Sequence, residues 1–352
     1  MTKPELGIYD VIDRHQMADF PLAADVYDEH IRGAQEAEQM GYKYYFSIEH
    51  QTSTVSYMSA PNIYLTALAR ATSTIRFGMM IYQLPFHHPI RLAEDTATVD
   101  ALSDGRLDVG LGRGTANYEY RGYNVDREES QGRFQESIKV IKGLWTTPEF
   151  SHQGEHYQVN RATLVPPPVQ QPHPPVYLAA TRTQATLEFV AGTGFPLIVG
   201  VVQDTPEALD LCRRFVELSG DAGHNVPMSE IPFFRYFHVG ETEEEARRDS
   251  REAVNWVQDM TQWRRQFPEG SEVHHHLEDW RRSRTELPPT YDYIYENRAI
   301  IGDPEQCIAK IKELQKEGIE YLGCTFSMGG MEHGKLMRSM ELFAKEVMPR
   351  FA

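Results

Sequence analysis

The chain has few cysteines, no long apolar run and no excess of basic residues. Its three cysteines, Cys212, Cys307 and Cys324, lie far apart among 352 residues. This scarcity argues against a disulfide framework or a zinc ribbon and predicts a reducing, cytoplasmic location. The first 14 residues lack the apolar segment of a signal peptide, and no apolar run approaches the ~18 residues of a membrane span.

The charge balance narrows the set of partners. The formal net charge is -16, which repels both phosphate backbones and anionic lipids, and no basic stripe offsets it. We therefore expect neither nucleic acid nor a membrane surface as a partner. The hydrophobic fraction of 41% is spread along the whole length, which predicts a globular chain with a substantial core.

Short apolar runs alternate with longer amphipathic stretches, the pattern typical of βα units around a parallel sheet. Eight apolar runs and their helices fit an α/β fold, a (β/α)8 TIM barrel with insertions, as one domain over residues 1–352. The predicted strands are 6–11, 44–48, 75–82, 106–111, 176–180, 197–201, 233–239 and 321–326. The predicted helices are 26–40, 63–71, 90–102, 134–144, 183–191, 206–218, 243–263 and 304–316.

Two segments depart from the βα alternation. Residues 151–175 are rich in proline and polar side chains, which predicts an excursion before the fifth strand. Residues 266–293 are charged and interrupted by prolines. A loop of that length in a compact domain is often a lid over a binding site, and a solvated surface segment is the alternative.

The glycine-rich segment 102–114, LSDGRLDVGLGRG, raises the question of whether the chain has a nucleotide-binding fold. A dinucleotide site needs G-x-G-x-x-G directly before a helix, whereas Gly110, Gly112 and Gly114 alternate and are followed by tyrosines. We interpret the segment as a turn, the fourth strand and its C-terminal end. There the glycines leave space for a ligand, and Arg113 either binds a phosphate or forms a structural salt bridge.

Chemically active residues follow other predicted strands. His50 comes after the second strand, where its imidazole could exchange protons near neutral pH or simply bond a neighbouring loop. After the fifth strand, Thr181, Arg182 and Thr183 begin a helix whose free backbone N–H groups favour an anion, with plain N-capping as the alternative. Together with Arg113, this helix start predicts one phosphate site.

Other chemistries have weak support in the sequence. His87 and His88 are adjacent and lack a carboxylate partner at a useful spacing, and 274–276 is a histidine triplet in a polar loop, so we predict no metal site. There is no G-x-S-x-G motif, and no cysteine has a histidine nearby. Covalent hydrolysis is therefore not indicated.

Residues 75–114, 174–198 and 300–330 resemble the signature segments of the bacterial luciferase-like flavin-dependent monooxygenase family, and the resemblance covers essentially the whole chain. It implies an eight-stranded barrel that binds reduced FMN delivered by a separate flavin reductase, as a two-component system. It further implies that dioxygen reacts with this flavin to give a flavin hydroperoxide, which oxidises a small organic and apolar substrate such as an aldehyde.

The resemblance also implies roles for individual residues. His50 matches the family's catalytic histidine, although the second histidine of its E-H-H segment is Gln51 here. Arg113 matches the arginine beside the flavin phosphate, and the reactive cysteine that precedes it in luciferase is Gly112 here. Further positions that would bind the cofactor are Arg133, Arg182, Thr183 and Thr186 near the phosphate, and Met79 and Met80 at a non-proline cis peptide beneath the ring.

Several alternatives remain open at this point. One branch of the same superfamily uses a deazaflavin for hydride transfer, and some relatives bind flavin without catalysis. The resemblance implies a homodimer through helices 63–71 and 90–102, whose small apolar residues core packing would also explain. Aromatic residues that could either line an apolar pocket or belong to the core are Tyr57, Tyr82, Tyr118, Phe233 and Trp256.

Overall fold

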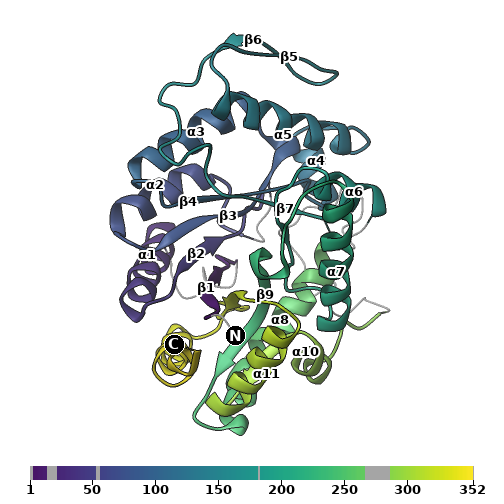
Figure 1. The fold of residues 1–352 in the computed structure, drawn as a ribbon. Coiled ribbons are helices and arrows are strands. Elements are labelled where there is room, and N and C mark those ends of the chain that lie inside the picture. The colour runs from purple at the N-terminus through teal and green to yellow at the C-terminus, as the bar shows by residue number, and fades with distance from the viewer. Residues whose placement is uncertain (1–2, 14–21, 53–55, 181–182, 266–285, 352) are drawn as a thin grey trace.

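The structure is a computed structural model that describes residues 3–13, 22–52, 56–180, 183–265 and 286–351. Parallel strands form a curled sheet with helices around its outside (Figure 1). The sheet order among the described residues is β10-β9-β11-β1-β2-β3-β4-β7-β8. These strands are β1 (Glu5–Asp10), β2 (Tyr44–Ser47), β3 (Arg76–Gln83), β4 (Leu107–Gly112), β7 (Val176–Ala179), β8 (Leu197–Ile198), β9 (Phe233–Val239), β10 (Ala299–Gly302) and β11 (Tyr321–Thr325).

The two ends of the sheet meet directly after β8. Val199 and Phe233 form an isolated parallel bridge. The Val199 N–H donates to the Pro232 carbonyl at 2.9 Å, and the Phe234 N–H donates to the Val199 carbonyl at 2.9 Å. These bonds join β8 to β9 and close the ring, so the predicted parallel barrel is confirmed.

One strand of the sheet was not predicted. β10 has four residues, and it pairs with the C-terminal half of β9, where Ala299 lies opposite Tyr236. The N-terminal half of β9 pairs with β11 instead, where Phe233 lies opposite Leu322. A four-residue strand that ends in glycine gives too short an apolar run to be distinguished from a loop in the sequence.

The helices cover the outside of the barrel. The eight predicted helices are present as α1 (Ala23–Met40), α2 (Pro61–Ala71), α3 (Pro89–Leu102), α5 (Ser130–Thr146), α6 (Gln184–Ala191), α7 (Thr205–Asp221), α8 (Glu243–Arg265) and α11 (Pro304–Lys316). The structure adds α4 (Asn117–Gly122), α10 (Tyr291–Asn297) and α12 (His333–Leu342). Among the described residues, no helix is long and apolar enough to cross a membrane.

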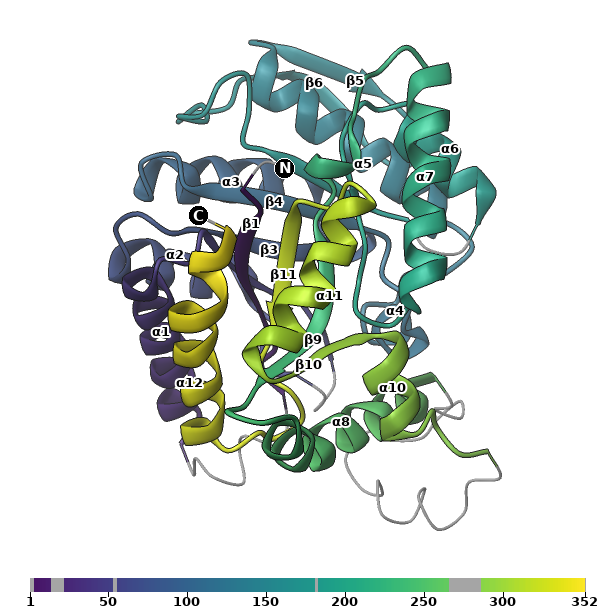
Figure 2. The same cartoon turned by 60° about the horizontal axis from the view of Figure 1, so that its bottom comes forward.

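Both segments that depart from the βα alternation can be placed in part. The excursion before the fifth barrel strand contains an antiparallel hairpin, β5 (Phe150–Gln153) with β6 (Gln158–Ala162). Two views show this hairpin on the side of the molecule away from α8 and α10 (Figure 2). Most of the predicted lid, residues 266–285, lies outside the described residues, and its predicted end is corrected because α10 already begins at Tyr291.

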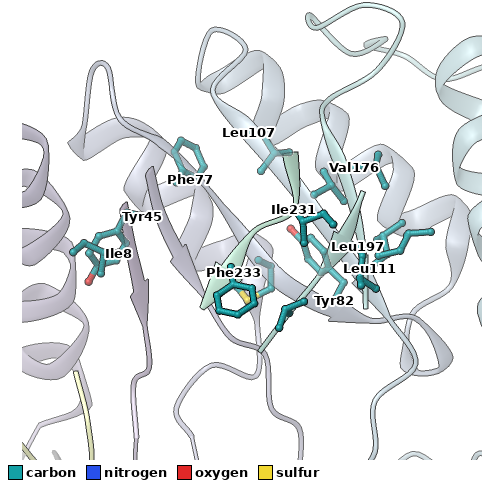
Figure 3. Close-up of a cluster of buried hydrophobic side chains, with 14 of the residues drawn as sticks. Ile8, Tyr45, Phe77, Tyr82, Leu107, Leu111, Val176, Leu197, Ile231 and Phe233 are labelled. Carbon is teal, nitrogen blue, oxygen red and sulfur yellow. The ribbon is translucent and has the colours of Figure 1, made fainter. Parts of the chain in front are cut away.

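Alternate side chains along each strand point to opposite faces, as the period of a strand requires. One set packs between the sheet and the helices, and Figure 3 labels Ile8, Tyr45, Phe77, Leu107 and Val176 in this layer. The other set fills the barrel with stacked rings, in which Tyr9 and Phe234 lie 4.4 Å apart between centroids. We call this second set the aromatic floor: Tyr9, Tyr44, Phe46, Met80, Ile198, Phe234 and Tyr321.

Candidate functional site

A cavity of about 600 Å³ opens at the C-terminal ends of the strands, where barrel enzymes place their active sites. Five consecutive strand ends contribute to its wall: His50 after β2, Gln83 in β3, Arg113 after β4, Ala180 after β7 and Gln203 after β8. The volume lies in the usual range of small-molecule and cofactor pockets. The cavity is therefore the candidate site.

The bottom of the cavity rests on the aromatic floor. Ile48 and Ile81 line the cavity and also pack against the floor residues. Of the aromatic residues that could line a pocket or belong to the core, Tyr118 lines the cavity, whereas Tyr82 and Phe233 belong to the buried layer between the sheet and the helices. The cavity thus combines an apolar surface at its bottom with polar side chains from the strand ends.

The non-proline cis peptide bond joins Met80 to Ile81, one bond later than the expected Met79–Met80 position. Met79 is buried in the layer against the helices, and Met80 is part of the aromatic floor. Ile81 is the residue of this segment that reaches the cavity. Neither methionine is among the residues that line the cavity, and their expected contact with a cofactor stays a prediction.

His50 is held by a buried carboxylate. Its Nδ1 lies 3.0 Å from Oε1 of Glu119, which comes from α4. The same oxygen accepts from the Gln51 N–H at 2.9 Å and from Gln83 Nε2 at 3.0 Å. Burial alone would raise the pKa of Glu119, but the hydrogen bonds and charge of His50, with these two donors, lower it below its ordinary value.

A second pair of histidine and carboxylate lies next to the first. Glu49 Oε1 is 2.7 Å from His87 Nε2, and Glu49 Oε2 accepts from the Gln83 N–H at 2.7 Å. Burial lowers the pKa of His87, but the Glu49 charge and hydrogen bond outweigh it and raise the pKa overall. The expectation that His87 lacks a carboxylate partner is wrong, because the partner comes from another strand end.

No group of three or more side chains in the described part of the chain could hold a metal ion. His87 has one carboxylate partner. The histidine triplet 274–276 lies outside the described residues.

A cluster of hydrogen-bond donors lies at the α6 side of the cavity. Thr183 caps α6 and accepts from the Thr186 N–H at 3.3 Å, and the two hydroxyl oxygens are 2.7 Å apart. Gln131, from α5, links this helix start to β4: its Oε1 accepts from Thr186 Oγ1 at 3.2 Å and from Arg113 Nη1 at 3.0 Å. The structure therefore brings Arg113, Thr183 and Thr186 together as expected and adds Gln131, which was not predicted.

Gln131 also carries an unused donor. Its Nε2 atom is buried and has no hydrogen-bond partner among the described residues, and a buried polar group without a partner is costly. Together with a guanidinium, hydroxyl groups and a helix N-terminus, this donor suits a phosphate. We call these four residues, Arg113, Gln131, Thr183 and Thr186, the anion cluster.

Of the two other expected phosphate contacts, only Arg133 can be placed. Arg133 does not line the cavity, and its Nε and Nη2 atoms bond Glu129 one helical turn earlier, at 2.8 Å and 2.7 Å. Arg182 lies outside the described residues. Arg127 does line the cavity, with its guanidinium 6.0 Å from the centre of the Tyr120 ring.

The glycines of the GLGRG segment give space to two residues of β3. A Cβ at Gly112 would lie 2.0 Å from Ile81 Cδ1, and a Cβ at Gly114 would lie 2.2 Å from Gln83 Oε1. Gly114 also has a φ of +71°, which side chains other than glycine rarely adopt. The motif thus lets Ile81 reach the cavity and lets Gln83 reach the carboxylates.

A closed parallel barrel with an anion cluster and a histidine around one rim cavity defines a barrel enzyme of the cofactor-binding kind. Residues 6–321 match the model of the luciferase-like monooxygenase family. The chain belongs to this family.

Relatives of known name extend over most of the chain. The oxygenase component of the flavin-dependent trigonelline monooxygenase of Acinetobacter baylyi is 27% identical over 346 residues, covering 97% of this chain and 94% of that protein. The alkanal monooxygenase alpha chain of Photorhabdus laumondii is 24% identical over 322 residues, covering 89% of each.

Solved structures with the same fold cover nearly all of the chain. The monooxygenase RslO1 from Streptomyces bottropensis superposes with a TM-score of 0.84 at 23% identity, covering 99% of this chain and 100% of that one. The oxygenating constituent of 3,6-diketocamphane monooxygenase of Pseudomonas putida, in complex with FMN, gives 0.81 at 18% identity and 99% of both chains. An F420-dependent secondary alcohol dehydrogenase gives 0.76 at 18% identity and 100% of both.

Proposed function

We propose that this chain is the oxygenase component of a two-component flavin-dependent monooxygenase. It binds reduced FMN, supplied by a separate flavin reductase, and uses dioxygen to oxidise a small organic substrate. The observation that carries the proposal is that one cavity of about 600 Å³ is lined both by anion-cluster residues and by the His50–Glu119 pair. The trigonelline and diketocamphane relatives are named as oxygenase components of such enzymes.

The residues present fit the phosphate and the ring of this cofactor. The phosphate would be held by Arg113, the hydroxyls of Thr183 and Thr186, and the buried Gln131 amide that has an unused donor. A flat ring would rest on the apolar floor at Ile81. Reduced flavin, when bound, supplies the electrons that activate dioxygen.

The chain's own residues supply proton control at the other end of the cavity. His50 holds or moves a proton beside the reacting groups, and its bond to Glu119 fixes the orientation of the imidazole. Ile48 and Ile81 offer apolar surface for the organic part of the substrate. The cavity walls would exclude water, which protects reduced-oxygen chemistry from side reactions.

The test combines binding and turnover. Fluorescence titration under reducing conditions is expected to show FMN binding, with riboflavin bound about tenfold or more weakly because it lacks the phosphate. Formation of an oxygenated product should then require NADH, FMN, a flavin reductase and this chain together, with aldehydes, ketones and N-methylated heterocycles as the substrate panel. Oxygen uptake alone is not a readout, because free reduced FMN also reacts with dioxygen. Binding without an oxygenated product from any substrate would favour a non-catalytic flavin-binding protein.

A second candidate is hydride transfer with a deazaflavin. The specific support is the F420-dependent secondary alcohol dehydrogenase, whose fold matches over the full length of both chains. F420 carries a phosphate group too, so the anion cluster does not discriminate between the cofactors. Parallel titrations with FMN and F420 decide: binding of F420 alone would overturn the proposal.

We further propose that the chain forms a homodimer through α2 and α3. Ile63 on α2 is 76% exposed, and a dimer through these helices would cover its apolar side chain. Substitution Ile63→Asp should convert a dimer to a monomer in light scattering at micromolar concentration. A wild-type protein that is already monomeric would contradict the dimer.

A further inference from the structure

We infer that Glu119 is a positioning residue, which orients His50 through Nδ1 and thereby assigns proton exchange in the cavity to His50 Nε2. The inference rests on the proposed function for the role of His50, but its geometry stands independently. Glu119 also contributes to the cavity wall, and its Oε1 acts through the histidine.

The packing of Glu119 leaves it little freedom. The residue is fully buried, with 0% of its surface exposed. Three donors converge on its Oε1, from His50, Gln51 and Gln83. Its Oε2 atom is buried, and the part of the chain that the structure describes offers it no hydrogen-bond partner. One oxygen therefore ties α4 to the ends of β2 and β3, and it does so at the atom that contacts the imidazole.

This arrangement determines the proton position on His50. A carboxylate only accepts hydrogen bonds, so Nδ1 carries the hydrogen that points at Glu119. The other ring nitrogen, Nε2, is then the atom at which a neutral imidazole accepts a proton and an imidazolium releases one. His50 lines the cavity, so this exchange takes place at the site.

The charge of Glu119 adds to the effect. An ionised carboxylate 3.0 Å from the ring favours the imidazolium form. The other titratable groups that face Glu119 are Tyr120 and Tyr123, with Glu49 reached through Gln83. Glu49 is bonded to His87, whereas Glu119 is the carboxylate that bonds the His50 ring within the described part of the chain.

The decisive variant is Glu119→Gln. The amide oxygen can keep the three bonds at the Oε1 position, and the amide nitrogen takes the position of the unpartnered Oε2, so the change removes charge and little else. In apo protein with labelled histidine, we expect the NMR titration midpoint of His50 to fall by about one pH unit or more. The substrate-dependent kcat should fall about tenfold or more, with the Kd for FMN unchanged within twofold.

Glu136→Gln serves as the matched control. Glu136 is also a buried glutamate that accepts three bonds, from the His156 and Tyr157 N–H groups and from His152, but it lies at the hairpin. The His50 midpoint and kcat should not change in this variant. An equal shift in both variants would show a general effect of charge removal and would overturn the inference.

A double-mutant cycle separates positioning from mere support of the fold. If Glu119 acts through His50, adding Glu119→Gln to His50→Ala should cause no further loss of kcat. Independent, multiplicative losses, or an unchanged His50 midpoint in Glu119→Gln, would overturn the inference. Should Glu119→Gln fail to fold by circular dichroism, Glu119→Asp keeps the charge but shortens its reach, and a His50 midpoint unchanged there would also overturn it.

The proposed function and the role of Glu119 can fail separately. Absence of any flavin-dependent oxygenated product with the wild type would defeat the proposed function. The NMR titration needs neither cofactor nor substrate, so it decides the positioning of His50 in either case.

Discussion

The aromatic floor and the rim cavity are built on the same strands but from opposite kinds of residue. The floor stacks rings, such as Tyr44 on Phe46 at 4.6 Å and Tyr9 on Phe234 at 4.4 Å. Directly above it, the rim buries Glu49 and Glu119 and satisfies them with histidine and glutamine donors. Burial of apolar rings stabilises the fold, whereas burial of carboxylates costs free energy unless they are paired.

The comparison shows that the floor mainly stabilises the fold, whereas the rim mainly orients the reactive groups of this barrel. The floor makes no use of charge, so its contribution to folding should be large and insensitive to pH. The rim uses charges whose net contribution to folding is small, and their value lies in orienting groups around the cavity. Changes in the two regions should therefore have effects of different kinds.

The largest effect is expected from the floor. Phe234→Ala removes a ring that is 1% exposed and stacks on Tyr9, and such a change typically costs about 3–5 kcal/mol of unfolding free energy. Urea denaturation measures this loss, and the FMN affinity of the folded protein should stay within twofold of wild type. A loss below about 1 kcal/mol, or a selective loss of FMN binding, would break the distinction between floor and rim.

The next effect is expected from the rim. His50→Ala should lower coupled product formation by about 100-fold, the usual scale of a lost proton-transfer group, while flavin binding changes little. His152→Ala is the control, because His152 pairs with Glu136 at the hairpin and lies away from the cavity. Turnover that is unchanged in His50→Ala would remove His50 from the chemistry.

A smaller effect is expected at the anion cluster. Arg113→Ala should weaken FMN about tenfold and leave riboflavin unaffected, because the guanidinium addresses the phosphate. Arg133→Ala should leave both affinities unchanged, since Arg133 is bonded to Glu129 outside the cavity lining. Equal losses of FMN affinity in the two variants would mean that the cofactor is attracted by the overall positive charge of this region and not by the anion cluster.

The sequence predicted the parts of this comparison that depend on local pattern. His50, Arg113 and Thr183 follow apolar runs, and the ends of parallel strands meet at one rim, so their convergence on the barrel rim could be foreseen. The same reasoning does not apply to Arg133, because this residue lies within α5 and not at the end of a strand. Residues two apart on a helix face different sides, so Gln131 reaches the cluster while Arg133 bonds Glu129.

Long-range partners were beyond the sequence. Glu119 and His50 are 69 residues apart, and α4, which carries Glu119, has six residues and too few turns for an apolar period. The partner of His87 could not be predicted for the same reason, because the carboxylate of Glu49 is 38 residues away in the sequence. Contacts of this kind form when the barrel closes. The sequence pattern predicts which residues lie at strand ends, but not which of them contact one another.

The smallest predicted effect tests the comparison through pH. The pKa of Glu119 is lowered in the folded protein because His50, Gln51 and Gln83 favour its charged form. A depressed carboxyl pKa contributes stability above the unfolded-state value and loses it as pH falls through the folded value. Between pH 6 and about pH 3, the wild type should therefore lose about 1 kcal/mol more unfolding free energy than Glu119→Gln, a typical single hydrogen-bond contribution.

The deficit in unfolding free energy caused by Phe234→Ala should stay constant over the same range, because no titrating group is lost with the ring. Urea denaturation of the three proteins at matched pH values measures both slopes, and a deficit of Phe234→Ala that varies with pH as strongly as that of Glu119→Gln would show that floor and rim are coupled rather than separate.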